Sequence, residues 1–233
     1  AAVSRECRAA RQSVAMMDAS TLGKIDVQGL DATEFLNRMY THDVDQMSIG
    51  RCAYGLLLGE DGMVMDDGVM ARLGPEHYYL TTTTGGAANV LSWLELWLQT
   101  EWPDLKVHLT SLTDQYSTIA VVGPKSRAVL ENLDCSEDLS ASAFPFMTVK
   151  PAMLNGIRVQ LFRVSFSGEL AFEVNVDSRY AAGLWTAIYE AGGSFDITPY
   201  GTETMHVLRA EKGFVIVGQD TDGSVTPGDL KMG

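Results

Sequence analysis

Two short segments of the sequence place carboxylates inside stretches that are otherwise apolar. In the segment Arg163–Val174, a Ser-Phe-Ser-Gly turn separates two apolar stretches and is followed by Glu169 and Glu173. A second, strand-like segment carries Asp66 and Asp67 side by side. A carboxylate is costly to bury unless other groups donate hydrogen bonds to it. Either arginines of the protein supply those donors, or a ligand rich in N–H groups does.

The two neighbouring aspartates should differ in what they face. Side chains alternate along a strand, so Asp66 and Asp67 point to opposite faces if their segment is extended. A carboxyl group held beside a reacting nitrogen can orient an amine, remove its proton and stabilise a developing cation. An aspartate pair followed by Gly68 is equally typical of a solvated hairpin turn. The residues alone leave both interpretations open.

The composition limits the classes of partner. The chain has 233 residues, 46% of them hydrophobic and 20% charged, which is ordinary for a globular protein with a sizeable core. Its formal net charge is −13 and its 17 basic residues form no cluster, which argues against nucleic acids and anionic membranes as partners. No apolar run approaches the roughly 20 residues needed to span a bilayer. We expect a cytoplasmic protein.

Cysteine and glycine spacing exclude several kinds of site. The three cysteines, Cys7, Cys52 and Cys135, lie far apart and the four histidines are scattered, so neither a zinc site nor a disulfide framework is expected. We therefore predict no metal. No Gly-x-Gly-x-x-Gly pattern follows a strand, so this chain is not expected to bind a flavin or nicotinamide dinucleotide itself.

Helix and strand patterns occur in separate groups along the chain. Helices are expected before about Met17, over Ala32 to about Tyr40, after Gly85–Gly86, from Pro124 to Leu133, near Arg179–Ala191 and near Gly201–Lys212. Strands are expected at Lys24–Gln28, Cys52–Leu58, Met63–Leu73, His77–Thr82, Lys106–Leu112, Thr118–Val122, Met147–Leu154 and Ile157–Arg163. Runs of strands joined by short turns and separated by helices predict an α+β fold, with antiparallel or mixed sheets and flanking helices.

Two local details follow from the same patterns. Asp31 stands where a helix N-cap is expected, with Glu34 in the capping-box position. Trp93, Trp97 and Trp102 accompany the helix after Gly85–Gly86 at a spacing more typical of a core than of a ligand platform.

Ordered landmarks over nearly the whole chain resemble one known family. The Arg-x-x-Phe-x-Gly-Glu-x-x-Phe-Glu pattern of Arg163–Glu173, downstream of the Asp-Asp pair, resembles the signature of folate-dependent aminomethyltransferases. That family includes the T-protein of glycine cleavage and the folate domains of flavoenzymes that oxidise dimethylglycine and sarcosine. The remaining landmarks occur in the expected order at Asp18–Ser20, Ala120–Pro124, Leu208–Gly213 and Val217–Asp220. The run Tyr200–Phe214 is most similar to the branch of heterotetrameric sarcosine oxidase α subunits.

The resemblance implies an architecture. Residues 1–233 would form one aminomethyltransferase-like folate-binding domain, built from two intertwined subdomains. The family normally continues into a small barrel-like domain, whereas Thr226–Gly233 ends this chain without a closing element. We therefore expect a fragment of a longer polypeptide that lacks the C-terminal barrel.

The resemblance also assigns site residues. Asp67 would be the catalytic carboxylate beside the folate nitrogens that accept a one-carbon unit, and Glu173 would accept the N–H pair of the pterin edge. The alternative for Glu173 is pairing with a nearby arginine. Further folate contacts are implied for Glu169, Arg163, Phe166, Tyr54 and Phe214.

Departures from the T-protein pattern favour the oxidase branch. Phe166 stands where T-protein has a tyrosine, Met205-His206 where it has Arg-Asp, and Phe214 at another aromatic-hydroxyl position. The resemblance thus implies an enzyme domain that captures the methylene unit from sarcosine demethylation as 5,10-methylenetetrahydrofolate. Its cofactor would be tetrahydrofolate, with flavin and NAD on other domains or subunits, and its partners the other subunits of a hetero-oligomer. The alternatives are a glycine-cleavage aminomethyltransferase and a non-catalytic folate-binding regulatory module.

Overall fold

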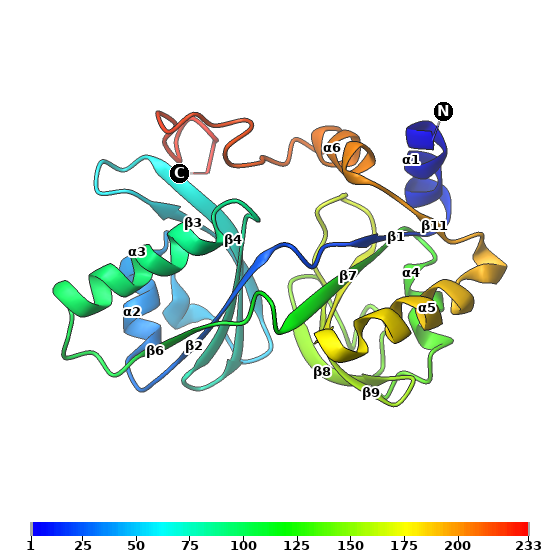
Figure 1. The fold of residues 1–233 in the computed structure, drawn as a ribbon, viewed down its shortest axis with the longest axis horizontal. Helices are drawn as coiled ribbons and strands as arrows, with labels where there is room; N and C mark the ends of the chain where they lie inside the picture. The colour runs from blue at the N-terminus through cyan, green and yellow to red at the C-terminus, as the bar shows by residue number, and fades with distance from the viewer. Residues whose placement is uncertain (1, 233) are drawn as a thin grey trace. The chain divides into compact units, whose positions relative to one another are not determined.

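Two compact units make up the fold (Figure 1). The structure, a computed structural model, describes residues 2–232. One unit combines the chain up to Thr21 with Asp114–Val215, and the other combines Leu22–Thr113 with the chain from Ile216 onward. Each unit is thus built from segments distant in sequence, which confirms the prediction of two intertwined subdomains.

The first unit contains a six-stranded sheet in the order β11-β1-β7-β10-β9-β8. Its strands are β1 (Ala15–Asp18), β7 (Tyr116–Val122), β8 (Val149–Leu154), β9 (Ile157–Phe162), β10 (Ala171–Asp177) and β11 (Thr198–Pro199). Its helices are α1 (Ala2–Gln12), α4 (Ser126–Glu131), α5 (Ala181–Ala191) and α6 (Thr202–Ala210), with 3₁₀ turns at Ser178–Tyr180 and Gly193–Phe195. The β1–β11 pair is parallel, and the other pairs are antiparallel.

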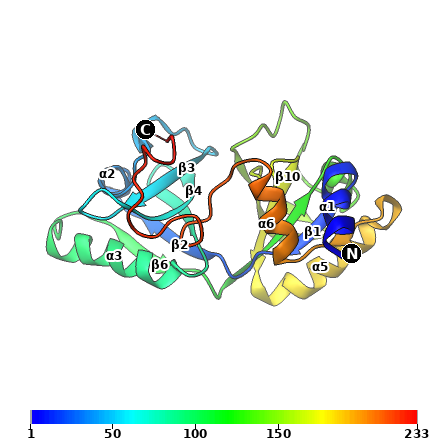
Figure 2. The same ribbon diagram turned by 90° about the horizontal axis from the view of Figure 1, so that it is seen from above.

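Alternation along β10 separates the two faces of this sheet. Phe172 and Val174 point into the larger core, where they pack with residues of α4 and α5 such as Leu130 and Leu184. Ala171 belongs to a smaller cluster with residues of α1 and α6. These two helices lie side by side over the other face (Figure 2). Because side chains alternate, Glu173 shares the face of Ala171.

The second unit contains a five-stranded antiparallel sheet in the order β3-β4-β5-β2-β6. Its strands are β2 (Gly23–Gln28), β3 (Cys52–Leu58), β4 (Val64–Gly74), β5 (His77–Thr82) and β6 (His108–Ser111). Its helices are α2 (Ala32–Met39) and α3 (Ala87–Thr100), with a 3₁₀ turn at Val44–Gln46. Strands β3, β4 and β5 form an antiparallel meander at the positions where the sequence predicts successive strands.

One apolar core fills the space between the second sheet and its helices. Phe35 and Leu36 of α2 and Leu94 of α3 are buried against strand residues such as Leu57 and Leu80. The tryptophans that accompany α3 pack against the same cluster, as predicted: Trp93, Trp97 and Trp102. The final segment belongs to this unit, since the Val64 amide donates to the Val225 carbonyl at 2.8 Å.

Asp31 occupies the predicted N-cap position of α2, but the capping box and the predicted start of α4 are wrong. Asp31 makes no capping hydrogen bond to α2, because its Oδ2 accepts from the Lys106 amide at 2.7 Å and so ties a distant loop to the helix start. Glu34 pairs with Arg38 one turn further along the helix rather than with the cap. Helix α4 begins at Ser126, two residues after Pro124. Within the described range, no helix is long and apolar enough to cross a membrane.

Candidate functional site

The register of β3 and β4 sends the two aspartates to opposite faces. Leu57 pairs with Asp66 and Leu56 pairs with Asp67. Leu57 is part of the apolar core, so Asp66 points to the core side of the sheet, toward α3. Asp67 lies on the other face, which it shares with Tyr54. The predicted alternation is confirmed.

The carboxyl group of Asp67 is partly buried and receives one strong donor. The Tyr54 hydroxyl donates to Asp67 Oδ2 at 2.7 Å. Burial raises the pKa of Asp67 to about 6; the Tyr54 hydrogen bond opposes that rise, and the neighbouring charge of Asp66 adds to it. Burial and the Asp67 charge also raise the pKa of Tyr54, so its hydroxyl remains a donor. A carboxyl group that titrates near neutrality is suited to exchange protons with an amine.

Asp66, by contrast, is buried and binds backbone amides of the protein. It is 3% exposed, and its Oδ1 accepts from the backbone amides of Asp67 at 2.9 Å and Thr83 at 3.4 Å. Its Oδ2 faces Gly86, where an added Cβ would lie only 2.1 Å away. Gly86 is the N-cap of α3, and a negative charge is favourable near the N-terminus of a helix. Through the Thr83 amide, Asp66 therefore links β4 to the turn that leads into α3, while its buried Oδ2 has no hydrogen-bond partner among the described residues and burial raises the pKa of the carboxyl group.

The raised pKa of Asp67 predicts a pH-dependent cost to stability. Because the folded-state pKa lies above the unfolded value, stability contributed by Asp67 is lost as pH rises from about 4 through about 6. Asp67→Asn cannot ionise, so its advantage in free energy of unfolding over wild type should grow by about 1–2 kcal/mol between about pH 4.5 and about pH 7.5. Denaturant unfolding at both pH values measures it. The exposed Asp61→Asn is the control, and an advantage independent of pH would contradict the prediction.

In the first unit, Glu173 lies on the sheet face covered by α1 and α6. Its strand neighbours are Ala120 on β7 and Phe162 on β9. Burial and the charge of Glu173 together raise the pKa of Tyr200, which places that tyrosine near the carboxylate. Tyr200 was not among the predicted site residues. It directly follows the two-residue strand β11, which no local sequence pattern indicated.

Phe166 and Phe214 form an exposed aromatic pair in the same unit. Their ring centroids are 6.2 Å apart and their planes differ by 17°, so the rings are stacked. They are 37% and 38% exposed, which is unusual for large apolar rings in contact with each other. Phe166 lies in the predicted turn, where Gly168 has φ +75°, and Phe214 follows α6. The pair offers a flat apolar surface to a planar ring.

Two other residues predicted to contact folate, Glu169 and Arg163, interact with other side chains of the protein. Glu169 Oε1 accepts from Arg11 Nη1 at 2.9 Å. The Arg163 guanidinium lies over the rings of Phe146 and Phe172, with its carbon 5.4 and 5.5 Å from their centroids. Phe172 faces the α4–α5 core, so Arg163 lies on the opposite sheet face from Glu173. Folate contacts by Arg163 and Glu169 stay predictions.

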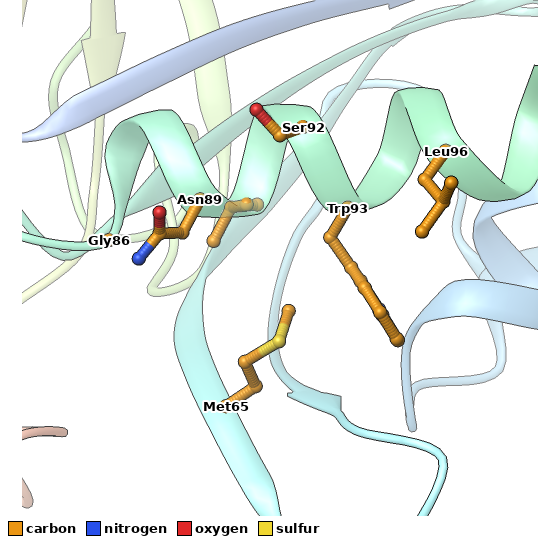
Figure 3. Close-up of a pocket in the computed structure, with 7 residues that line it drawn as sticks. Met65, Gly86, Asn89, Ser92, Trp93 and Leu96 are labelled. Atoms are coloured by element: carbon orange, nitrogen blue, oxygen red, sulfur yellow. The ribbon is translucent and has the colours of Figure 1, made fainter.

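Cavities within the units do not coincide with these residues. One, of about 340 Å³, lies between Met65 of β4 and the side of α3 that carries Trp93 and Leu96 (Figure 3). A groove of about 830 Å³ along β8 and β9 is lined by Met153, Arg158 and others. Neither is lined by Asp67 or Glu173. Among residues 2–232, no group of three or more His, Cys, Asp or Glu side chains is placed to hold a metal ion.

The amino-acid sequence of this chain is similar to parts of several known enzymes. A subunit alpha of sarcosine oxidase from Corynebacterium sp. (strain U-96) is 57% identical over 99% of this chain and 24% of its own length. The corresponding subunit from Rhizobium meliloti is 44% identical over 99% of this chain and 23% of its own length. An aminomethyltransferase from Chloroherpeton thalassium is 34% identical over 98% of this chain and 61% of its own length. The chain thus spans about a quarter of the sarcosine oxidase subunits that it matches.

Solved structures agree on the fold. The glycine cleavage system aminomethyltransferase T from Bartonella henselae superposes with a TM-score of 0.84 at 24% identity, over 97% of this chain and 58% of that one. A chain of the heterotetrameric sarcosine oxidase from Corynebacterium sp. U-96 gives a TM-score of 0.60 at 17% identity, over 86% of this chain and 95% of that one. The family model described as the GCVT N-terminal domain matches residues 1–233. The chain therefore belongs to the GCVT N-terminal domain family.

Proposed function

We propose that residues 1–233 form a tetrahydrofolate-binding domain of a sarcosine oxidase α subunit, which captures the methylene unit of sarcosine as 5,10-methylenetetrahydrofolate. The observation that carries the proposal is the partly buried Asp67 carboxyl group, which accepts a hydrogen bond from Tyr54 and whose pKa burial raises to about 6. The 57% identity to a sarcosine oxidase subunit alpha supports the choice of substrate.

The proposed chemistry at Asp67 is a proton transfer. Tetrahydrofolate, when bound, supplies the nitrogens that accept a carbon at the oxidation level of formaldehyde. As a carbon–nitrogen bond forms, the Asp67 carboxylate takes the proton of the accepting nitrogen and returns it to the amine that leaves the carbon. Tyr54 keeps the carboxylate oriented by its hydrogen bond.

The first unit offers groups that suit the ring system of a reduced pterin. The Glu173 carboxylate can accept two parallel N–H bonds from a ring nitrogen and its neighbouring amino group. Phe166 and Phe214 present an exposed apolar surface on which a planar ring can stack. These residue types are the reason to assign this unit to folate recognition.

The proposal includes partners. Flavin and NAD would be held by other domains or subunits of a cytoplasmic hetero-oligomer, and the relative described as heterotetrameric supports that assembly. The alternative function is a glycine-cleavage aminomethyltransferase, favoured by the 34% identity to such an enzyme. Assaying the full-length protein with sarcosine and with an aminomethylated lipoyl carrier distinguishes the two.

Folate binding should depend on Glu173. We expect Glu173→Gln to weaken folinic acid binding by about 10- to 150-fold, because the amide loses one acceptor of a charge-assisted pair worth about 1.5–3 kcal/mol. Calorimetry on the full-length protein measures the change. Glu190→Gln, an exposed change on α5, is the matched control. Equal affinities would assign Glu173 a structural role, and no binding by wild type at about 1 mM ligand would refute the function.

A further inference from the structure

We propose that Arg11 is a positioning residue for the proposed folate site, holding the turn that carries Phe166 against the end of α6 that leads to Phe214. This inference rests on the proposed function. Neither the sequence pattern nor the family resemblance assigned Arg11 a role.

Every donor of the Arg11 guanidinium has an acceptor. Nη1 donates to the Ser167 carbonyl at 2.6 Å and to Glu169 Oε1 at 2.9 Å. Nη2 donates to the Leu208 carbonyl at 2.9 Å and to Glu211 Oε2 at 2.7 Å, and Nε donates to the same Glu211 oxygen at 3.2 Å. An arginine has five N–H donors in a fixed planar arrangement, and here all five are used. One side chain thus joins α1, the turn and α6.

The turn also packs directly against Lys212, two residues after the end of α6. Gly168 has φ +75°, and a Cβ at this position would lie 2.5 Å from Cγ of Lys212. The amide of Gly168 donates to Ser165 Oγ at 3.0 Å, which closes the turn locally. Arg11 therefore fixes a close packing contact rather than bridging an open gap.

Both aromatic rings lie close along the backbone to a group that Arg11 binds. Phe166 is the neighbour of Ser167, whose carbonyl Arg11 binds. On the other side, the Phe214 amide donates to the Arg209 carbonyl at 3.1 Å, and Arg209 Nη1 donates to the Phe214 carbonyl at 3.0 Å. Arg209 directly follows Leu208, the second backbone acceptor of Arg11. Arg11 thus binds a backbone carbonyl close to each ring, that of Ser167 beside Phe166 and that of Leu208 beside Arg209. The stacking of the two rings depends on these two contacts.

Two charged side chains of α1 bind the two ends of α6, and each has the sign of charge that the dipole of α6 favours at that end. Glu6 Oε2 accepts from the Gly201 amide at 3.2 Å and from Thr204 Oγ1 at 2.6 Å at the start of α6. Arg11 binds a carbonyl in the last turn. An acid at the N-terminus and a base at the C-terminus both complement the helix dipole. Because Glu6 remains, loss of Arg11 should release the C-terminal end of α6 and the turn while α1 and α6 stay joined.

The test compares Arg11→Gln and Arg11→Lys in the full-length protein, with Arg8→Gln as control for loss of charge on an exposed position of the same helix. We expect both Arg11 variants to raise the Kd for folinic acid about 3- to 10-fold, since Lys carries three donors at one point and cannot replace a planar five-donor group. Hydrogen exchange of residues 165–169 and 208–215 should accelerate without ligand. One-carbon capture at saturating folate should keep its wild-type rate, because Asp67 is untouched.

A double-mutant cycle separates positioning from general stabilisation. If Arg11 acts through the rings, Arg11→Lys should add no further loss of affinity in a Phe166→Ala background. Additive losses, or Arg11 variants that bind like Arg8→Gln, would overturn the role of Arg11 while leaving the proposed function standing. Wild-type protein that fails to bind folinic acid would instead refute the proposed function, and this inference with it.

Discussion

Asp67→Asn should cut one-carbon capture by about 10²- to 10⁴-fold, the usual contribution of a positioned acid–base group. Folate affinity should change little, because the amide still accepts the Tyr54 hydrogen bond and keeps the shape of the side chain. The variant should also be at least as stable as wild type at neutral pH, since it removes a carboxylate whose ionisation is opposed by burial. Lost activity together with gained stability is typical of a residue kept for function.

The measurement is a product ratio. With sarcosine and saturating tetrahydrofolate, the full-length assembled protein that carries Asp67→Asn should release free formaldehyde in place of methylenetetrahydrofolate. The ratio of the two products is corrected for the background of spontaneous condensation between formaldehyde and tetrahydrofolate. Sarcosine turnover should be unchanged, because that oxidation is proposed to occur elsewhere. The neighbouring Asp66 would make a poor control position, because it is buried and binds the turn before α3. The exposed Asp61→Asn serves instead, and an unchanged product ratio for Asp67→Asn would leave the domain as a passive folate holder.

Local patterns predicted the parts of the fold that local forces determine. The bounds of β3 and β5 agree with the predicted strands, because their apolar residues are bounded by turns. The opposite orientation of Asp66 and Asp67 followed from strand alternation alone. The core role of the α3 tryptophans followed from helical periodicity.

Features that depend on long-range contacts were not predictable in this way. Arg11 reaches acceptors 156 to 200 positions away, and its helical spacing resembles that of Arg5 and Arg8, which are exposed. Asp31 stands at the N-cap of α2 but makes no side-chain capping hydrogen bond, because its carboxylate binds the amide of Lys106, 75 positions away. The division into two intertwined units followed from the family resemblance rather than from periodicity, since no composition shift marks the crossing points.

The start of α3 should tolerate a methyl group at one glycine and not at its neighbour. Gly86→Ala is expected to lower the free energy of unfolding by about 1–3 kcal/mol, because its Cβ would lie 2.1 Å from Asp66 Oδ2 and 2.7 Å from Thr83 Oγ1. The backbone at Gly86 has φ −85° and ψ −14°, which alanine adopts freely, so crowding is the cause of the loss. Gly85→Ala meets no atom within 4 Å and should be neutral or slightly stabilising.

The loss in Gly86→Ala should depend on the carboxylate that it crowds. Asp66 is buried, so its side chain cannot swing into solvent without giving up the bonds to the amides of Asp67 and Thr83. Removing that carboxylate first, in Asp66→Ala, relieves the closer of the two contacts, so Gly86→Ala should then cost less than in the wild type, with only Thr83 Oγ1 still crowding the new Cβ. Denaturant unfolding of the two single variants and the double variant measures this coupling. Equal losses for Gly85→Ala and Gly86→Ala, or strictly additive losses in the double variant, would mean that the contact between Asp66 and the start of α3 does not constrain this turn.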